Sequence, residues 1–157
     1  MSACGERYGW PMASETMSRA IAAPSDTVFH AVSAIGSYPE TFPSVTKVEF
    51  LGEQREGRGT RFRETRFASG RDGTSEVEVT DFVAGERIQL EDESLGSKWT
   101  TTYAVADEGG NTRLTMTVQA EPQKLMARLT MALSMSGYRK NMEKHLDTIK
   151  AHCEAAT

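Results

Sequence analysis

The sequence predicts one α+β domain in which a curved, seven-stranded antiparallel sheet is joined to two short helices and one long C-terminal helix. Six strand-like segments follow one another between residues 45 and 120 with short connections, which favours an antiparallel meander. One further strand candidate and a short helical stretch precede them. A helical pattern of about 30 residues, roughly 45 Å long, follows them and can lie across a concave sheet face.

The first elements are a strand and two short helices. Residues 15–23 alternate weakly between apolar and polar side chains, which predicts the first strand. Pro24 and Ser25 are typical of a helix start, and Gly36 is typical of a helix end. Residues 37–43 contain two prolines and two aromatic residues, so we expect a second short helix or turn that forms a stiff apolar plug.

The six strands of the meander are β-prone or alternating segments separated by charged or glycine-containing turns. Their predicted ranges are 45–51, 60–68, 75–83, 87–91, 98–106 and 112–120. Pro122 is then expected to open the long helix, which runs to about Glu154. The apolar residues of this helix are mostly spaced by threes, fours and sevens, as one buried face requires. They are Leu125, Leu129, Leu133, Met142, Leu146 and Ile149.

Residues 1–14 show no period, and two glycines and a proline break any regular element there. We expect a loose extension over these residues and a single domain over residues 15–157. The extension has no basic start followed by an apolar block, so it does not resemble a secretory signal. We therefore expect a cytoplasmic protein in which Cys4 and Cys153 are free thiols.

Composition and charge narrow the function classes. The 157 residues include 38% hydrophobic and 25% charged residues, near the averages of globular domains. The net charge of -4 argues against a nucleic-acid binder that relies on phosphate attraction. No apolar run reaches the roughly 18 residues that a membrane span needs, so we expect no stable membrane insertion.

Metal and phosphate sites are also not expected. His145 and His152 are seven residues apart, about two helical turns, which is too far to bind one metal ion without further ligands. Gly109 and Gly110 belong to a hairpin turn and not to a glycine-rich phosphate loop before a helix. We expect neither a metal nor a cofactor.

Three strands of the meander each have a face that is expected to point to the concave side and the long helix. These faces are Ile88 and Leu90; Trp99, Thr101, Tyr103 and Val105; and Leu114, Met116 and Val118. One interpretation is an ordinary core. The other is a cavity, because a hydroxyl on a buried face must find a partner in a ligand, a water molecule or a neighbouring side chain.

The strand over residues 60–68 allows two phases. In the first, Phe62, Glu64 and Arg66 face inward, and a carboxylate and a guanidinium two residues apart enter an apolar space. Such a pair could orient a polar ligand group or take part in acid–base chemistry. The second phase instead places Arg61, Arg63, Thr65 and Phe67 inward. The alternative to a functional role for Glu64 and Arg66 is that both face solvent at a sheet edge or pair structurally.

The long helix carries methionines that suit a surface adapting to apolar ligands, although core filling is the alternative. One stripe consists of Met131, Met135, Tyr138 and Met142, and another consists of Leu125, Leu129 and Leu133. One stripe should grip the sheet and the other should overhang the cavity, and the sequence leaves their assignment open. Tyr138 could offer its phenol to a ligand.

Several of these segments together resemble one known family. The run IAAPSDTVFHAVSAIGSYPETFPSVTKVEFL is similar to the opening of SRPBCC (START-like) proteins, in particular their polyketide cyclase/dehydrase-like branch. The segment GTRF, the spacing of Trp99 and Tyr103, and the segment GGNTRLT also resemble that family. The resemblance covers about residues 15–155. It implies a helix-grip fold with an interior cavity, in a family whose members bind lipids, sterols, quinones or aromatic polyketides.

We therefore expect the chain to bind or transport a hydrophobic small molecule, as a monomer or a homodimer. The expected ligand-binding residues are Phe62, Glu64, Arg66, Trp99, Thr101, Tyr103, Met116, Met131, Met135 and Tyr138. One alternative is a polyketide cyclase or aromatase that uses polar cavity residues such as Glu64, Arg66, Tyr103 or Tyr138. Another is a protein-interaction module, which predicts an exposed apolar patch and a filled interior.

Overall fold

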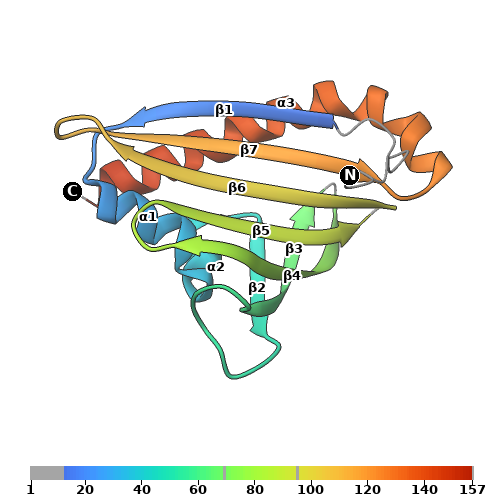
Figure 1. Ribbon diagram of the computed structural model, residues 1–157, viewed down its shortest axis with the longest axis horizontal. Coiled ribbons are helices and arrows are strands. Elements are labelled where there is room, and N and C mark those ends of the chain that lie inside the picture. Colours follow the sequence, from blue (N-terminus) through green and yellow to red (C-terminus); the bar gives the residue numbers. More distant parts are fainter. Residues whose placement is uncertain (1–12, 69, 95, 157) are drawn as a thin grey trace, which may run out of the picture.

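In the computed structural model, a curved antiparallel sheet lies over one long helix (Figure 1). The structure describes residues 13–68, 70–94 and 96–156, apart from the side chains of residues 68, 128 and 130–137. The elements are β1 (Ala13–Ile21), α1 (Ser25–Ser33), the 3₁₀ helix η1 (Ile35–Ser37), α2 (Tyr38–Thr41), β2 (Val45–Phe50), β3 (Arg61–Ala68), β4 (Arg71–Val83), β5 (Arg87–Ser94), β6 (Ser97–Asp107), β7 (Thr112–Pro122) and α3 (Leu125–Ala155). The predicted fold class and element order are confirmed.

The described residues form one seven-stranded sheet in the order β1-β7-β6-β5-β4-β3-β2. Strands β2 to β7 are a simple meander, and β1 pairs antiparallel with β7, from Ala13 opposite Ala120 to Ile21 opposite Thr112. Inward and outward positions alternate along β7, where Leu114, Met116, Val118 and Ala120 are buried. This period of two is the pattern that predicted the concave face.

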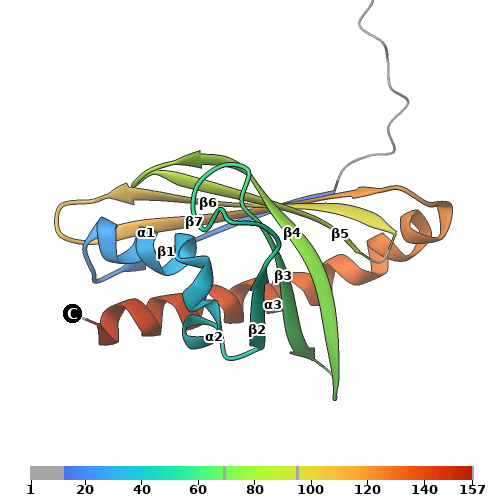
Figure 2. The ribbon, with the colours of Figure 1, turned by 90° about the horizontal axis from the view of Figure 1, so that it is seen from below.

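Helix α3 lies beneath the concave face of the sheet (Figure 2). One stripe of its C-terminal half, Met142, Leu146, Ile149 and Cys153, is almost completely buried. Because these residues recur at helical spacing, they place one face of α3 against the sheet and the two short helices.

Polar contacts to β1 align α3 along the sheet. The Arg19 guanidinium contacts the Asp147 carboxylate at 3.0 Å, and the Lys150 ammonium donates to the Ala20 carbonyl at 2.9 Å. The Ala22 amide donates to the Glu154 carboxylate at 3.0 Å. These contacts lie on one flank of the buried stripe, so the opposite flank of α3 is left to face the space beneath the middle of the sheet.

The two short helices fill one end of that space. Val28 and Val32 of α1 are completely buried. Tyr38, the first residue of α2, and Phe42, which follows α2, are each only 2% exposed. The Tyr38 hydroxyl donates to the Val32 carbonyl at 2.6 Å, which satisfies the buried phenol and joins the two helices. The expected apolar plug is therefore present.

Two predictions about the long helix are wrong. Pro122 is the last residue of β7, opposite Ser97, and α3 begins only at Leu125. A proline is compatible with a strand end, where a missing N–H costs little. Leu125 and Leu129 neither grip the sheet nor overhang the cavity, since they are 59% and 63% exposed. The reason is that the buried contact of α3 is concentrated in its C-terminal half.

Smaller differences concern element ends and the thiols. β1 begins at Ala13, inside the expected extension, while residues 1–12 and Cys4 lie outside the described residues. Cys153 has a free, buried thiol, and burial raises its pKa to about 11. No helix within the described ranges is long and apolar enough to cross a bilayer.

Candidate functional site

A cavity of about 660 Å³ lies between the concave face of the sheet, the end of α2 and the flank of α3 that does not contact β1. Its walls come from strands β3 to β7, from α3 and from the segment that follows α2. The volume lies within the roughly 300–1,000 Å³ that is usual for small-molecule sites. The interior is therefore not filled. The interaction-module alternative predicts a filled interior and does not agree with this cavity.

One wall of the cavity is a pair of stacked aromatic rings. Trp99 of β6 and Tyr138 of α3 lie with their ring centroids 5.0 Å apart and their planes at 26°. The Trp99 indole N–H donates to the Ser94 carbonyl at 3.2 Å, so its polar atom is already bonded and the ring adds apolar surface to the cavity. Met116 and Leu90 extend this apolar surface along β7 and β5.

A second aromatic pair carries the hydrogen bond that joins the sheet to the helix across the cavity. The His145 imidazole stacks on Phe42 at 4.5 Å and 17°. Its Nε2 atom shares a hydrogen bond of 2.6 Å with the Tyr103 hydroxyl. Burial, assisted by the nearby Arg66 guanidinium, lowers the pKa of His145 to about 4. Burial also raises the pKa of Tyr103, so both groups are neutral at neutral pH.

Strand β3 brings a charged pair to the same cavity. The Arg66 guanidinium donates to the Glu64 carboxylate, and both side chains line the cavity. The Glu64 side chain is 10% exposed and that of Arg66 is 44% exposed, which places the guanidinium nearer the solvent. Burial lowers the pKa of Arg66, but the Glu64 carboxylate outweighs it and the pKa is raised. β3 thus adopts the first of its two predicted phases.

Asp92 adds a carboxyl group next to the aromatic wall. It lies on β5 directly opposite Trp99 and lines the cavity. Burial raises the pKa of Asp92, and a hydrogen bond from Ser94 partly opposes this effect. The carboxylate also contributes to raising the pKa of Tyr138, after burial. The cavity therefore combines apolar ring faces with several polar groups that could orient a ligand.

Most of the residues expected at the site line this cavity. They are Glu64, Arg66, Trp99, Thr101, Tyr103, Met116 and Tyr138. Phe62 shares their face of the sheet but is completely buried, with its ring 6.1 Å from that of Tyr38, and belongs to the core. The side chains of Met131 and Met135 lie outside the described residues.

Sequence reasoning missed Phe42, Asp92 and His145 as cavity residues. The signal for His145 was its spacing of seven from Tyr138, which puts both on one helix face. The signal for Asp92 was the alternation of β5, because Leu90 and Asp92 share a strand face. Nothing in the local sequence indicated that Phe42 would reach the cavity.

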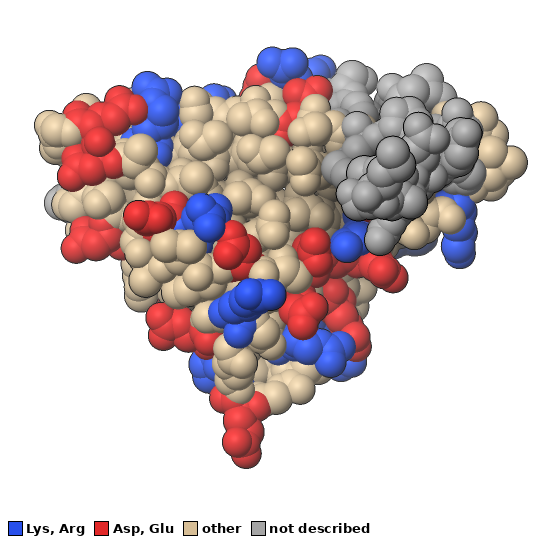
Figure 3. Space-filling model, in the orientation of Figure 1, with Lys and Arg blue, Asp and Glu red and all other residues tan. Residues whose placement is uncertain are grey.

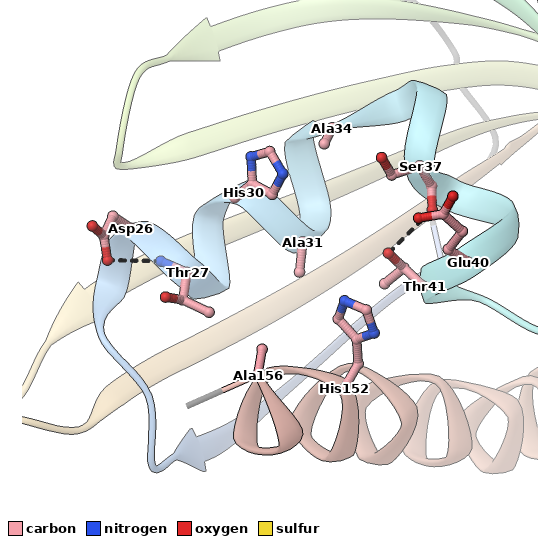
Figure 4. A pocket seen from close by; sticks show the side chains of 10 residues that line it. All are labelled: Asp26, Thr27, His30, Ala31, Ala34, Ser37, Glu40, Thr41, His152 and Ala156. Carbon is pink, nitrogen blue, oxygen red and sulfur yellow. Dashed lines mark hydrogen bonds between the residues drawn. The ribbon is translucent and has the colours of Figure 1, made fainter.

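A second cleft, of about 560 Å³, lies between α1, α2 and the C-terminal end of α3 (Figure 4). His30 and His152 line it and are both exposed, and the Thr41 hydroxyl within it is bonded to the Ser37 carbonyl at 3.2 Å. The cleft has no aromatic wall among its lining residues. Across the described part of the chain, no three His, Cys, Asp or Glu side chains are grouped as a metal site would need. The interior cavity is therefore the better candidate for the functional site.

Comparison with known proteins agrees with this architecture. The model of a family described as polyketide cyclase / dehydrase and lipid transport matches residues 12–154. Among curated protein sequences, none matches the chain significantly.

Solved structures share the fold at low identity. Zhui aromatase/cyclase from Streptomyces sp. R1128 has a TM-score of 0.72 and 18% identity over 92% of this chain and 94% of its own. TTHA0849 from Thermus thermophilus has a TM-score of 0.69 and 22% identity, covering 92% and 99%. Ara h 8.0201 has a TM-score of 0.73 and 13% identity, covering 92% and 99%. At such identities these structures show a common fold and nothing narrower.

Proposed function

The chain belongs to the polyketide cyclase/dehydrase and lipid transport family, and we propose that it binds a planar, largely apolar small molecule in the cavity beneath its sheet. The observation that carries this proposal is the stacked wall of Trp99 and Tyr138, which borders about 660 Å³ of interior space. Flat ring systems stack favourably on such faces, with centroids about 4.5–7 Å apart.

The polar groups of the cavity support a ligand that also carries hydrogen-bonding atoms. The Thr101 hydroxyl, the Asp92 carboxyl group and the Glu64–Arg66 pair all line the space. Apolar pockets with a few well-placed polar groups are the usual form of small-molecule sites, in which the polar groups set orientation and specificity. An aromatic polyketide or a quinone has this combination of a flat apolar body and peripheral oxygens.

Two adjacent residues of β6 provide a matched test. Thr101 lines the cavity, whereas Thr102 points to the other face of the sheet, where its hydroxyl accepts from Gln89 at 3.2 Å. The fluorescent probe N-phenylnaphthylamine should bind the wild-type chain with saturation. Thr101→Phe places a ring inside the cavity, next to the Trp99–Tyr138 wall, and should weaken probe binding about tenfold or more. Thr102→Phe adds the same bulk outside and should leave it unchanged.

The proposal fails if the probe does not bind, or if both variants weaken it equally. Native mass spectrometry of the purified protein gives an independent measurement. An apolar molecule that co-purifies with the wild-type chain, and not with Thr101→Phe, would identify the natural ligand class.

A second candidate function is acid–base catalysis of the cyclase or aromatase kind, and the Tyr103–His145 hydrogen bond is the observation that favours it. With its pKa lowered to about 4, the imidazole is neutral at neutral pH and can accept a hydrogen bond from the Tyr103 hydroxyl, which orients the phenol. The phenol beside it, whose pKa is raised by burial, stays protonated and could donate a hydrogen bond that polarises a ketone oxygen.

This candidate requires turnover that binding alone does not produce. A synthetic poly-β-ketone thioester, incubated with the wild-type chain, should yield a product lighter by one water when cyclisation is followed by aromatisation. Tyr103→Phe and His145→Gln should abolish that product while N-phenylnaphthylamine still binds. An unchanged thioester in the presence of the wild-type chain leaves binding as the function.

A further inference from the structure

One carboxyl group on the cavity wall has no cationic partner. Asp92 of β5 is half-buried, and its side chain lines the cavity. Among the described side chains, no lysine, arginine or histidine forms an ion pair with Asp92, and its hydrogen bond comes from Ser94. A carboxylate has two oxygen atoms that together accept about four hydrogen bonds. Asp92 can therefore accept a further donor from a ligand.

Several other carboxylates of the sheet have basic partners. Figure 3 shows acidic and basic residues intermixed over the lower part of the outer sheet face. Glu91, the residue before Asp92, contacts the Lys98 ammonium at 3.6 Å. On the cavity side, the Glu64 carboxylate accepts from Arg66. Asp92 differs from them, because its charge is left for a cation that the chain does not supply.

The rings of the aromatic wall stand next to this carboxyl group. Asp92 and Trp99 are direct partners in the β5–β6 ladder, and side chains at such positions have Cβ atoms about 4.5–5.5 Å apart. Tyr138 stacks on Trp99, and Asp92 contributes, after burial, to raising the pKa of Tyr138. Aromatic ring faces attract cations within about 6 Å. An ammonium group placed at Asp92 would thus meet a carboxylate and two electron-rich rings.

The other charges of the cavity do not cancel this preference. Burial raises the pKa of Asp92 most, and among the charged groups Glu64 raises this pKa more than Arg66 lowers it. Surroundings whose charges favour a proton on Asp92 also favour another positive charge beside it. Lys144 lines the cavity too, but it is exposed and lies roughly 9 Å along the helix from Tyr138. The cations of the cavity are therefore either paired or at the other end of the aromatic wall.

We propose that the cavity ligand carries a protonated amine, and that Asp92 binds this group beside Trp99 and Tyr138. The inference rests on the proposed function, because the apolar body of the ligand lies along the aromatic wall. A hydrogen bond from an ammonium to a carboxylate is charge-assisted and stronger than one between neutral groups. Burial penalises an unpaired ammonium, and the Asp92 carboxylate offsets that penalty for a ligand whose nitrogen reaches it.

The test compares three small naphthalenes that share one apolar body and one point of attachment. Naphthylmethylamine is cationic at neutral pH, naphthylmethanol is neutral and naphthoate is anionic. Each competes with N-phenylnaphthylamine bound to the full chain, and the loss of fluorescence gives its affinity. The wild-type chain should bind the amine about tenfold more tightly than the alcohol, and naphthoate more weakly than both.

A pair of variants on β5 identifies the group that selects the amine. Asp92→Asn keeps the shape of the side chain, removes its charge and should abolish the preference for the amine over the alcohol. Glu93→Gln is the matched control, because it removes the same charge from the next residue, which is exposed and points to the other face of the strand. It should keep the full preference. Urea unfolding checks that both variants fold, and the comparison of the three naphthalenes on the wild-type chain does not depend on either.

Three outcomes would overturn this inference and leave the proposed function standing, since N-phenylnaphthylamine is bound in each of them. The first is equal affinity of the wild-type chain for the amine and the alcohol. The second is a preference for the amine that Asp92→Asn retains. The third is tightest binding of naphthoate, which would assign the selection of ligands to Arg66. A chain that does not bind N-phenylnaphthylamine at all would overturn both proposals.

Discussion

Protonation of His145 should destabilise the folded chain, and this effect can be isolated. The imidazole is held between the Phe42 ring and the Tyr103 hydroxyl, and the Arg66 guanidinium adds a positive charge nearby. A positive charge on His145 would be poorly solvated there and would be repelled by Arg66. The imidazole is therefore expected to stay neutral until the pH is far below the range in which an unfolded histidine becomes charged.

The magnitude follows from the two pKa values. The pKa of His145 is lowered from 6.5 to about 4 by folding, and each pH unit between these values is worth about 1.4 kcal/mol. Between pH 6.5 and about 4, the unfolded chain binds a proton that the folded chain does not, so stability falls as the pH falls. The free energy of unfolding should decrease by about 3 kcal/mol through this residue alone.

Urea unfolding at a series of pH values, from 7 to about 4, measures the effect. The loss of stability across this range should be smaller in His145→Gln than in the wild-type chain by about 3 kcal/mol. His30→Gln is the matched control, because it removes an exposed histidine, and its pH dependence should follow the wild type. Equal pH dependence in all three proteins would refute the argument.

Three further predictions concern the core, a turn and the buried thiol. Phe62→Ala should lower the free energy of unfolding by about 3–5 kcal/mol, whereas Phe67→Ala, at a 53% exposed site, should cost far less in the same urea titration. Gly96→Ala should destabilise the chain by about 1–2 kcal/mol, because Gly96 has a φ of 75°, which strains any residue with a side chain, and a thermal melt reports the loss. In a Cys4→Ser background, iodoacetamide should modify Cys153 only as fast as the chain opens, since burial raises the pKa of this thiol to about 11; rapid modification of the folded chain would contradict its burial.

The sheet could be predicted because its signals are local. Alternation of period two identified the inward residues of β6 and β7, and short turns fixed the neighbours in the meander. The same alternation placed Glu64 and Arg66 on one face of β3, and only the choice between two phases stayed open. The structure resolves it through Phe62, whose completely buried ring sets the inward face of the strand.

The environment of each residue on the long helix could not be predicted in the same way, because the helix has four faces in different surroundings. One stripe is buried, one flank forms ion pairs and hydrogen bonds with β1, another flank lines the cavity, and the remaining face is in solvent. Leu125 and Leu129 have the same spacing as the buried Met142 and Leu146, but they lie beyond the part of the helix that packs. Apolar spacing alone does not say where along a helix its contact ends.

The polar flank of α3 also explains why the cavity exists. Tyr138, Asn141 and His145 face the concave side of the sheet, where Trp99, Met116 and their neighbours are largely apolar. The Tyr138 ring stacks on Trp99 and His145 is bonded to Tyr103, but closer packing of the Asn141 amide against the apolar part of the sheet would bury polar atoms without partners. Such burial costs about 1–3 kcal/mol for each group.

Each of the contacts that hold α3 in place lies elsewhere on the helix. The buried stripe and the contacts to β1 set its distance from the sheet, and the Tyr103–His145 bond is the hydrogen bond that spans the cavity among the described side chains. The sheet and the helix are thus held apart by the residues that join them, and the resulting space is available to a ligand that offers both flat apolar surface and hydrogen-bonding atoms. A ligand of that kind would offer hydrogen bonds to the polar flank of the helix and apolar contact to the face of the sheet. The sheet face cannot offer those hydrogen bonds, and the helix flank cannot offer that apolar contact.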